Sequence, residues 1–203
     1  MRPRKSNKKV ERKIHLQKTA IQELVGHGKP TKENITQIIK SIQKMIIEAK
    51  TTTDVRDGYK KTPEQMVQEG KIKVIYRDSG PHFGMTPKYG CYQMSSILYT
   101  ALKEMGLSPK MTRHFVAGTP HTTVLFRLEG KLYESDPFES MLAAPPGEKG
   151  MSHLENPYFT KVDEHRRKEI SELMKIGRFK FIKPGQYTKQ MYDRERRSGK
   201  LAV

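Results

Sequence analysis

The sequence predicts a single domain of the α+β class, and three observations lead to that prediction. Apolar residues recur at helical spacing after Thr31 and again after Cys91, as in helices that bury one face. Apolar and polar residues nearly alternate between Lys110 and Ser135, as in antiparallel strands joined by turns. Of the 203 residues, 34% are hydrophobic and 30% are charged, which supplies apolar material for one core but not for two.

The first half of the chain is expected to be mainly helical. Residues 1–13 are expected to form a basic, disordered arm, because residues 2–13 contain seven bases and one acid. Thr31 caps the second apolar stripe, and Pro63 suits the first turn of a short helix. The expected elements are helices over 10–25 and 31–50, a short helix after Thr62, a strand over 71–77 and an irregular loop over 78–89.

The second half is expected to place one helix on an antiparallel sheet. The helix that begins at Cys91 should end at Gly106, because glycine adopts a positive φ without a Cβ penalty. The elements expected after it are strands over 110–117, 121–128 and 131–135, an aperiodic segment over 143–158 and a last helix over 164–176. Residues 14–183 would then form one domain, followed by a charged C-terminal tail over 184–203.

The net charge of +17 is unevenly distributed. Residues 91–140 contain five bases and five acids, so the excess lies in the flanks. A basic arm of this kind attracts nucleic acid, an anionic membrane surface or an acidic protein, and it equally serves as a solvated tail.

Two features of the sequence bear on the compartment. No run of about 18 apolar residues occurs, and the N-terminus lacks the apolar stretch of a secretory signal. The single cysteine, Cys91, cannot form an internal disulfide, which fits a reducing compartment. We therefore expect a cytoplasmic protein without a membrane span.

The residue types needed for thiol acyl transfer occur in order along the predicted core. Cys91 stands at a helix start, where the helix dipole favours thiolate over thiol. His121 opens a predicted strand and Asp136 ends the next one. Because adjacent antiparallel strands lie about 5 Å apart, the imidazole and the carboxylate can meet across the pairing. The order therefore predicts a nucleophile, a base and a group that orients the base.

These residues resemble the core of the transglutaminase-like superfamily. The resemblance rests on a Gly-Cys helix start, an apolar helix, a strand that opens with histidine and another that ends in Asp-Pro. The matching segments are Gly90-Cys91, Met105-Gly106-Leu107, Pro120-His121-Thr122-Thr123-Val124 and Glu134-Ser135-Asp136-Pro137. The resemblance covers about 50 residues closely and implies a papain-like α+β fold. It also implies a triad of Cys91, His121 and Asp136.

The sequence departs from the family pattern in two places. Thr122 and Thr123 follow the histidine where an aromatic residue is common, and the chain has no tryptophan. The amide of Cys91 is a natural oxyanion donor, but the family also uses a polar or aromatic partner upstream. Tyr76, His82 and Tyr89 are the candidates for that role and for lining the substrate cleft. Arylamine N-acetyltransferases share the order Cys, His, acid, but no segment indicates a coenzyme A site.

The same residues are also suited to other roles. His114 is the rival base and would have to reach Cys91 from the preceding strand. A metal site could use Cys91, His82, His114 and His121, yet no close ligand pair occurs, and the seven-residue spacing of the strand histidines favours no shared face. Ser95 and Ser96 are read as small packing residues inside the Cys91 helix.

The sequence thus predicts a cysteine hydrolase or acyltransferase that acts on an amide or peptide bond through a thioester at Cys91. Hydrolysis is favoured over amine transfer, because the chain is small and lacks acidic calcium-binding clusters. The mechanism requires no metal and no organic cofactor. The expected substrate is a protein or peptide. The alternative is a non-catalytic module of the same fold that uses its basic flanks to hold nucleic acid or an acidic partner.

Overall fold

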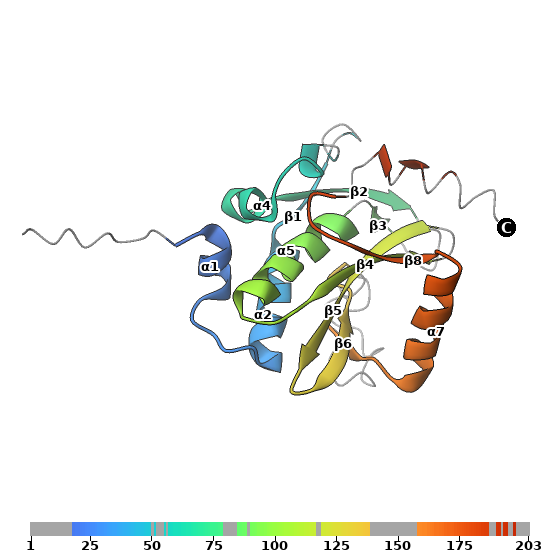
Figure 1. Ribbon diagram of the computed structural model, residues 1–203. Coiled ribbons are helices and arrows are strands. Elements are labelled where there is room, and N and C mark those ends of the chain that lie inside the picture. Colours follow the sequence, from blue (N-terminus) through green and yellow to red (C-terminus); the bar gives the residue numbers. More distant parts are fainter. Residues whose placement is uncertain are drawn as a thin grey trace, which may run out of the picture.

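The computed structural model has an α+β architecture in which helices pack on an antiparallel sheet, so the predicted class is confirmed. It describes residues 18–49, 51, 55, 57–78, 85–88, 90–116, 119–138 and 158–186, and single residues between 190 and 197. The expected arm over 1–13 lies outside the described residues, as does most of the tail. Figure 1 shows one central helix, α5, between the N-terminal helices and the larger sheet, with α7 beyond that sheet.

Three helices precede the central one: α1 (Ala20–Val25), α2 (Lys32–Lys44) and α4 (Pro63–Glu69). The predicted cap of α2 is confirmed, because the Thr31 side chain accepts a hydrogen bond from the amide of Asn34. The short helix after Thr62 is confirmed as well, with a reciprocal capping box between Thr62 and Gln65. The buried stripe of α2 consists of Ile35, Ile38, Ile39 and Ile42.

The region before the central helix contains a small sheet that the sequence indicated only in part. Its strands are β1 (Ile46–Glu48), β2 (Ile72–Asp78) and β3 (Met85–Lys88), with β1 parallel and β3 antiparallel to β2. The expectation of a helix to residue 50 is wrong, because the β-branched pair Ile46-Ile47 joins β2 as a strand. The expectation of an irregular loop over 78–89 is wrong for Met85–Lys88, which pair with β2.

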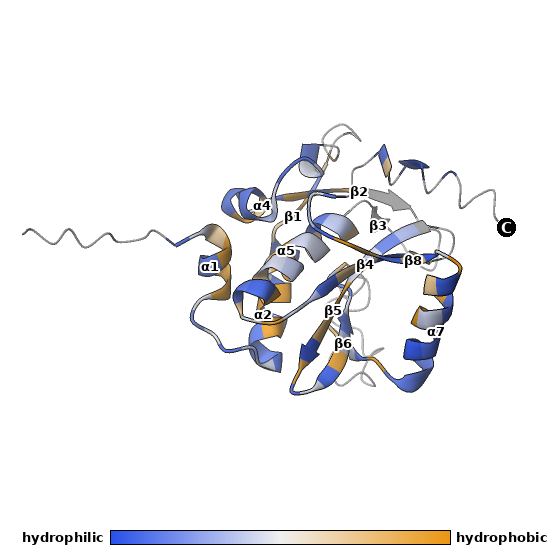
Figure 2. Cartoon of the chain, in the orientation of Figure 1, coloured by the Kyte–Doolittle hydropathy of each residue, from blue (hydrophilic) through white to orange (hydrophobic). Residues whose placement is uncertain are grey.

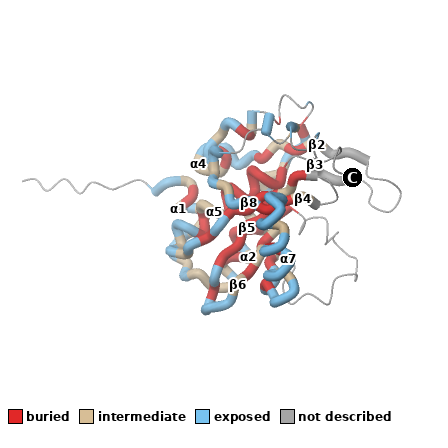
Figure 3. Tube along the Cα trace, turned by 45° about the vertical axis from the view of Figure 1, so that its right-hand side comes forward, coloured by how far each residue is buried: buried red, intermediate tan, exposed pale blue. Residues whose placement is uncertain are grey.

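The central helix α5 (Cys91–Glu104) is the most deeply buried helix among the described residues. It packs against α1, α2, α4 and β5, and Figure 3 shows it buried in the middle of the molecule. The predicted stop is confirmed, since Gly106 has a φ of 82°. The expected one-sided stripe is wrong for the first two turns, where every residue from Cys91 to Leu98 is buried. Polar residues in these turns therefore need partners inside the protein.

The larger sheet has five strands in the order β7-β6-β5-β4-β8. The predicted strands are confirmed as β4 (Lys110–Val116), β5 (Thr119–Leu128) and β6 (Lys131–Ser135), all antiparallel. The turn between β5 and β6 uses Glu129 and Gly130, both at positive φ, which suits a two-residue hairpin. The edge strands β7 (Thr160–Lys161) and β8 (Phe179–Ile182) were not predicted, because both are very short.

The last helix, α7 (Glu164–Lys175), closes the side of the sheet that faces away from α5. Its buried contact is narrow: Ile170 joins Leu125, Val162 and Phe179 in a small cluster separate from the main core. Figure 2 shows α7 as mainly hydrophilic, in agreement with that narrow contact. Among the described residues, no helix is both long and apolar enough to cross a membrane.

Candidate functional site

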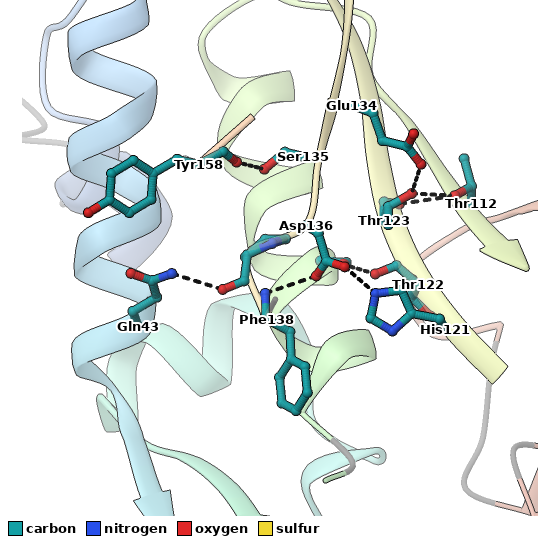
Figure 4. A network of polar contacts seen from close by, with 12 residues as sticks. Gln43, Thr112, His121, Thr122, Thr123, Glu134, Ser135, Asp136, Phe138 and Tyr158 are labelled. Atoms are coloured by element: carbon teal, nitrogen blue, oxygen red, sulfur yellow. Dashed lines mark hydrogen bonds and ion pairs between the residues drawn. The ribbon is translucent and has the colours of Figure 1, made fainter. Parts of the chain in front are cut away.

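The ends of strands β5 and β6 bring two of the predicted site residues into contact. The ring nitrogen Nε2 of His121 pairs with Oδ2 of Asp136, and Figure 4 shows the imidazole and the carboxylate directed at each other. The second carboxylate oxygen, Oδ1, accepts the backbone N–H of Phe138 at 3.0 Å. Both oxygens of the Asp136 carboxylate thus have hydrogen-bond partners. The carboxylate is held in place and in turn fixes the orientation of the His121 imidazole.

Cys91 meets the same imidazole from the start of α5. Its side chain is 5% exposed and hydrogen-bonds to His121. Because Asp136 holds Nε2, Nδ1 is the ring nitrogen left for the thiol. The structure therefore brings Cys91, His121 and Asp136 together in series, with the histidine in the middle.

The surroundings of His121 favour its charged form. Burial by itself would lower the pKa of the imidazole. The negative charge of Asp136 and its hydrogen bond act in the opposite direction, and the contact with Cys91 adds to them. Together they raise the pKa of His121 well above its ordinary value of 6.5, so the imidazolium is favoured at neutral pH.

At the start of α5, the backbone lies very close to neighbouring side chains. Gly90 is the N-cap and is buried, and a Cβ built on it would lie 2.8 Å from side-chain atoms of both Phe138 and Val74. No side chain caps this helix, and its first turn contains no acidic residue. The amide of Cys91 stands at the first position of the helix, where no earlier turn supplies an acceptor, and an amide in this position can stabilise a developing oxyanion.

A buried hydroxyl ties the nucleophile helix to the histidine strand. Ser95, one turn after Cys91, donates a hydrogen bond to the backbone carbonyl of Thr122 at 2.9 Å. Thr122 directly follows His121, so this bond sets the distance between the thiol and the imidazole. The expectation that Ser95 and Ser96 serve only as packing residues is wrong for Ser95, and Ser96 makes a longer contact of 3.7 Å with the sulfur of Met111.

Strand β6 is fixed just before Asp136 by two further contacts. Glu134 receives two hydrogen bonds from the guanidinium of Arg166 on α7, at 2.8 and 3.0 Å. Burial favours the neutral form of Glu134, but the hydrogen bonds and charge of Arg166 outweigh it and lower the pKa of the carboxyl. Ser135 donates to the backbone carbonyl of Tyr158 at 2.8 Å. These contacts hold the strand end that carries the aspartate; the bond between Ser135 and Tyr158 is drawn in Figure 4.

After Asp136, the backbone is also held from α2. Gln43 donates through its amide to the carbonyl of Pro137 at 3.0 Å. No pattern in the sequence indicated the contact of Gln43 with Pro137 or that of Arg166 with Glu134, because each joins residues more than thirty positions apart.

The rival base, His114, lies beside His121. The two residues are Cα partners in the β4–β5 ladder, and their rings meet edge to face with centroids 5.6 Å apart. The expectation that the strand histidines share no face is wrong, because the antiparallel register of β4 and β5 pairs them directly opposite each other. Burial and repulsion by His121 lower the pKa of His114 to about 4, so its ring is neutral at neutral pH.

The upstream oxyanion candidates remain predictions. Tyr76 lies in β2 with its backbone opposite Pro87, but its side chain is outside the described part of the structure. His82 and Tyr89 lie outside the described residues altogether. Within the described ranges, no group of three or more histidine, cysteine and acidic side chains is arranged to hold a metal ion.

Comparison with known proteins gave no relative. The chain matches no protein-family model, no curated protein and no solved structure.

Proposed function

We propose that this protein is a thiol-dependent enzyme of papain-like, transglutaminase-like type that acts on an amide or peptide bond through a thioester at Cys91. The observation that carries the proposal is the series Cys91–His121–Asp136, in which one imidazole contacts the thiol and the carboxylate together. A buried histidine with a raised pKa beside a cysteine at a helix start is typical of an activated thiol.

The proposed reaction has two halves. In the first, the Cys91 sulfur attacks the substrate carbonyl, and the oxyanion that forms is stabilised by the backbone amide of Cys91 at the start of α5. The His121 imidazolium gives its proton to the leaving amine, and the C–N bond breaks to leave a thioester. In the second, neutral His121 takes a proton from the acyl acceptor, which attacks the thioester and releases Cys91. Asp136 keeps the imidazole in one orientation and stabilises its charge throughout.

The acyl acceptor determines the reaction class, and we propose water. Hydrolysis gives a protease or amidase, whereas attack by a lysine amine would give a cross-linked product. A glutamine-containing peptide separates the two outcomes, because both release ammonia but only amine transfer incorporates a labelled amine. We expect release of ammonia without incorporation.

The proposal is tested by the rate at which iodoacetamide labels Cys91 at pH 6, measured by mass spectrometry. A thiol paired with an imidazolium reacts much faster at this pH than a free thiol, and we expect His121→Ala to abolish the difference. His27→Ala, which changes an exposed histidine far from Cys91 in sequence, is the matched control and should label like the wild type. A wild-type rate equal to that of the urea-unfolded protein would refute the proposal.

The net charge of +17 favours a second candidate, a non-catalytic module that holds nucleic acid or an acidic protein. This candidate expects a slow Cys91 label together with nucleic-acid binding that weakens steeply with salt. The two measurements together distinguish an enzyme from a binding module.

A further inference from the structure

Three aromatic rings form a row across three adjacent strands of the larger sheet. His114 on β4 is the Cα partner of His121 on β5 and of Phe179 on β8. Its ring meets His121 edge to face at 5.6 Å and stacks on Phe179 at 5.5 Å with an angle of 16° between the planes. The ring of His114 is therefore stacked on Phe179 on one side and packs against the ring of His121 on the other.

The imidazole of His114 lowers the stability of the protein compared with an apolar ring at this position. The residue is 4% exposed, and its Nδ1 is buried without a hydrogen-bond partner. A buried polar atom left unpaired costs on the order of 1–3 kcal/mol, whereas phenylalanine would fill a similar volume with no polar atom. A residue that opposes stability inside a well-packed sheet is the kind of exception that marks a functional position.

The position also lies where a charge would matter to the proposed triad. The titratable groups that act on His114 are His121 from β5, Glu134 and Asp136 from β6 and its end, and Arg166 from α7; β8 contributes the uncharged Phe179. His121 is favoured as an imidazolium by the groups around it. A neutral neighbour leaves that imidazolium undisturbed, and a protonated neighbour would repel it.

We propose that His114 is a positioning residue, whose ring holds the His121 imidazole in the orientation in which one nitrogen meets Asp136 and the other meets Cys91. The inference rests on the proposed function, since it assigns His114 a part in the same site. The ring supplies the positioning, and its nitrogens make the positioning depend on pH, because protonation in acid places a second cation against His121.

The test compares three substitutions at this position by the iodoacetamide rate of Cys91 between pH 4 and pH 9. His114→Leu keeps bulk but not the flat ring, and His114→Ala removes both. We expect each to slow labelling at pH 7 by about tenfold or more, because misplacing a reacting group is that costly. His114→Phe restores the ring, and we expect it to recover the rate to within about threefold. Should the alanine variant not fold, the leucine variant decides the result.

The pH profile carries the second half of the test. The wild-type rate should fall in acid with an ionisation near pH 4, and His114→Phe should lack that ionisation and keep its reactivity to lower pH. Thr112→Val is the matched control, since Thr112 is buried two residues away on β4 and bonds to Thr123 instead of His121. Its profile should follow the wild type.

Two results would overturn the inference: a leucine variant that labels as fast as the wild type, or a phenylalanine variant with an unchanged acid limb. Failure of the proposed function is recognised separately, by a wild-type rate that His121→Ala does not alter. In that event the nitrogen NMR shifts of the His121 ring still decide the matter. His114→Leu must change them for the positioning role to hold, and unchanged shifts would refute it.

Discussion

Replacement of His114 by phenylalanine should change how the stability of the protein depends on pH. In the unfolded chain the imidazole is protonated with its ordinary pKa of 6.5. In the folded protein, burial and the charge of His121 lower this pKa to about 4. The unfolded state therefore binds more protons than the native state between these two values. By linkage, wild-type stability falls as the pH is lowered through this window, and His114 contributes no such effect above it.

The size of the effect follows from the two pKa values. They differ by about 2.5, and each unit is equivalent to about 1.4 kcal/mol, so about 3 kcal/mol of stability is lost between neutral pH and pH 4 through this one side chain. The side chain is 4% exposed, so solvent screening reduces this value little. The phenylalanine variant has nothing to titrate at this position and escapes the loss.

The assay is urea unfolding of wild type and His114→Phe at half-unit steps from pH 4 to pH 8. Acidic residues destabilise both proteins alike in acid, so the difference between the two free energies of unfolding isolates His114. We expect a difference of about 1–3 kcal/mol in favour of phenylalanine at pH 8, from removal of the unpaired Nδ1, and a further increase of about 3 kcal/mol at pH 4. A difference that stays constant over the whole range would show that His114 titrates normally in the folded protein and would refute the reasoning.

Three further predictions concern the site and its supports. His121→Gln should lower the free energy of unfolding by its full amount below about pH 6.5, and this loss should disappear as the pH rises through the raised pKa of the native imidazole. The pH dependence is thus opposite to that of His114, and a loss that grows toward alkaline pH would contradict the prediction. Gly90→Ala should destabilise by about 1–3 kcal/mol and slow Cys91 labelling, since the new Cβ meets packed side chains at 2.8 Å. Gly58→Ala is the milder comparison for denaturation and labelling alike, since its Cβ would meet only the buried Gln93 side chain, no closer than 3.2 Å. Ser95→Ala should cost about 1 kcal/mol in denaturation and slow labelling, while Ser96→Ala, also buried on α5, should change labelling little; equal effects of the two serines would argue against a specific tie between α5 and β5.

Much of the sheet could be predicted, because its central strands are local. β4, β5 and β6 follow one another with short turns, so alternation and turn residues define them without knowledge of the rest of the chain. The same locality let the sequence place His121 and Asp136 side by side. The central helix was placed as well, since Gly106 marks its end.

The elements that were not predicted form through tertiary contacts, which leave no alternation of apolar and polar residues in the sequence. Ile46 continues the helical period of α2, and only the pairing with β2 makes Ile46 and Ile47 part of a strand. β8 is four residues long, and its pairing with β4 joins positions almost seventy apart. Short edge strands of this kind are decided by the tertiary structure, so local propensity is a weak guide to them.

The supports of the site were missed for the same reason. Arg166 reaches Glu134 from a helix that is adjacent only in space. Ser95 looked like a small residue suited to close packing, but full burial of the first two turns of α5 requires its hydroxyl to find a partner. The residues off the apolar stripe of α5 are mainly polar, Gln93, Ser95 and Ser96 among them, so no apolar pattern indicated that these turns are buried on all sides.

The row of rings explains why two neighbouring histidines behave in opposite ways. Their centroids are 5.6 Å apart and both are largely buried, so placing a positive charge on both rings at once is unfavourable. Asp136 pairs directly with the ring of His121 and thereby favours the proton on that ring. His114 then becomes the neutral member, because burial and the charge of its neighbour both lower its pKa. Removing the carboxylate by Asp136→Asn should therefore lower the pKa of His121 and weaken its repulsion of His114, so that the pKa values of the two histidines, followed by NMR, move toward each other.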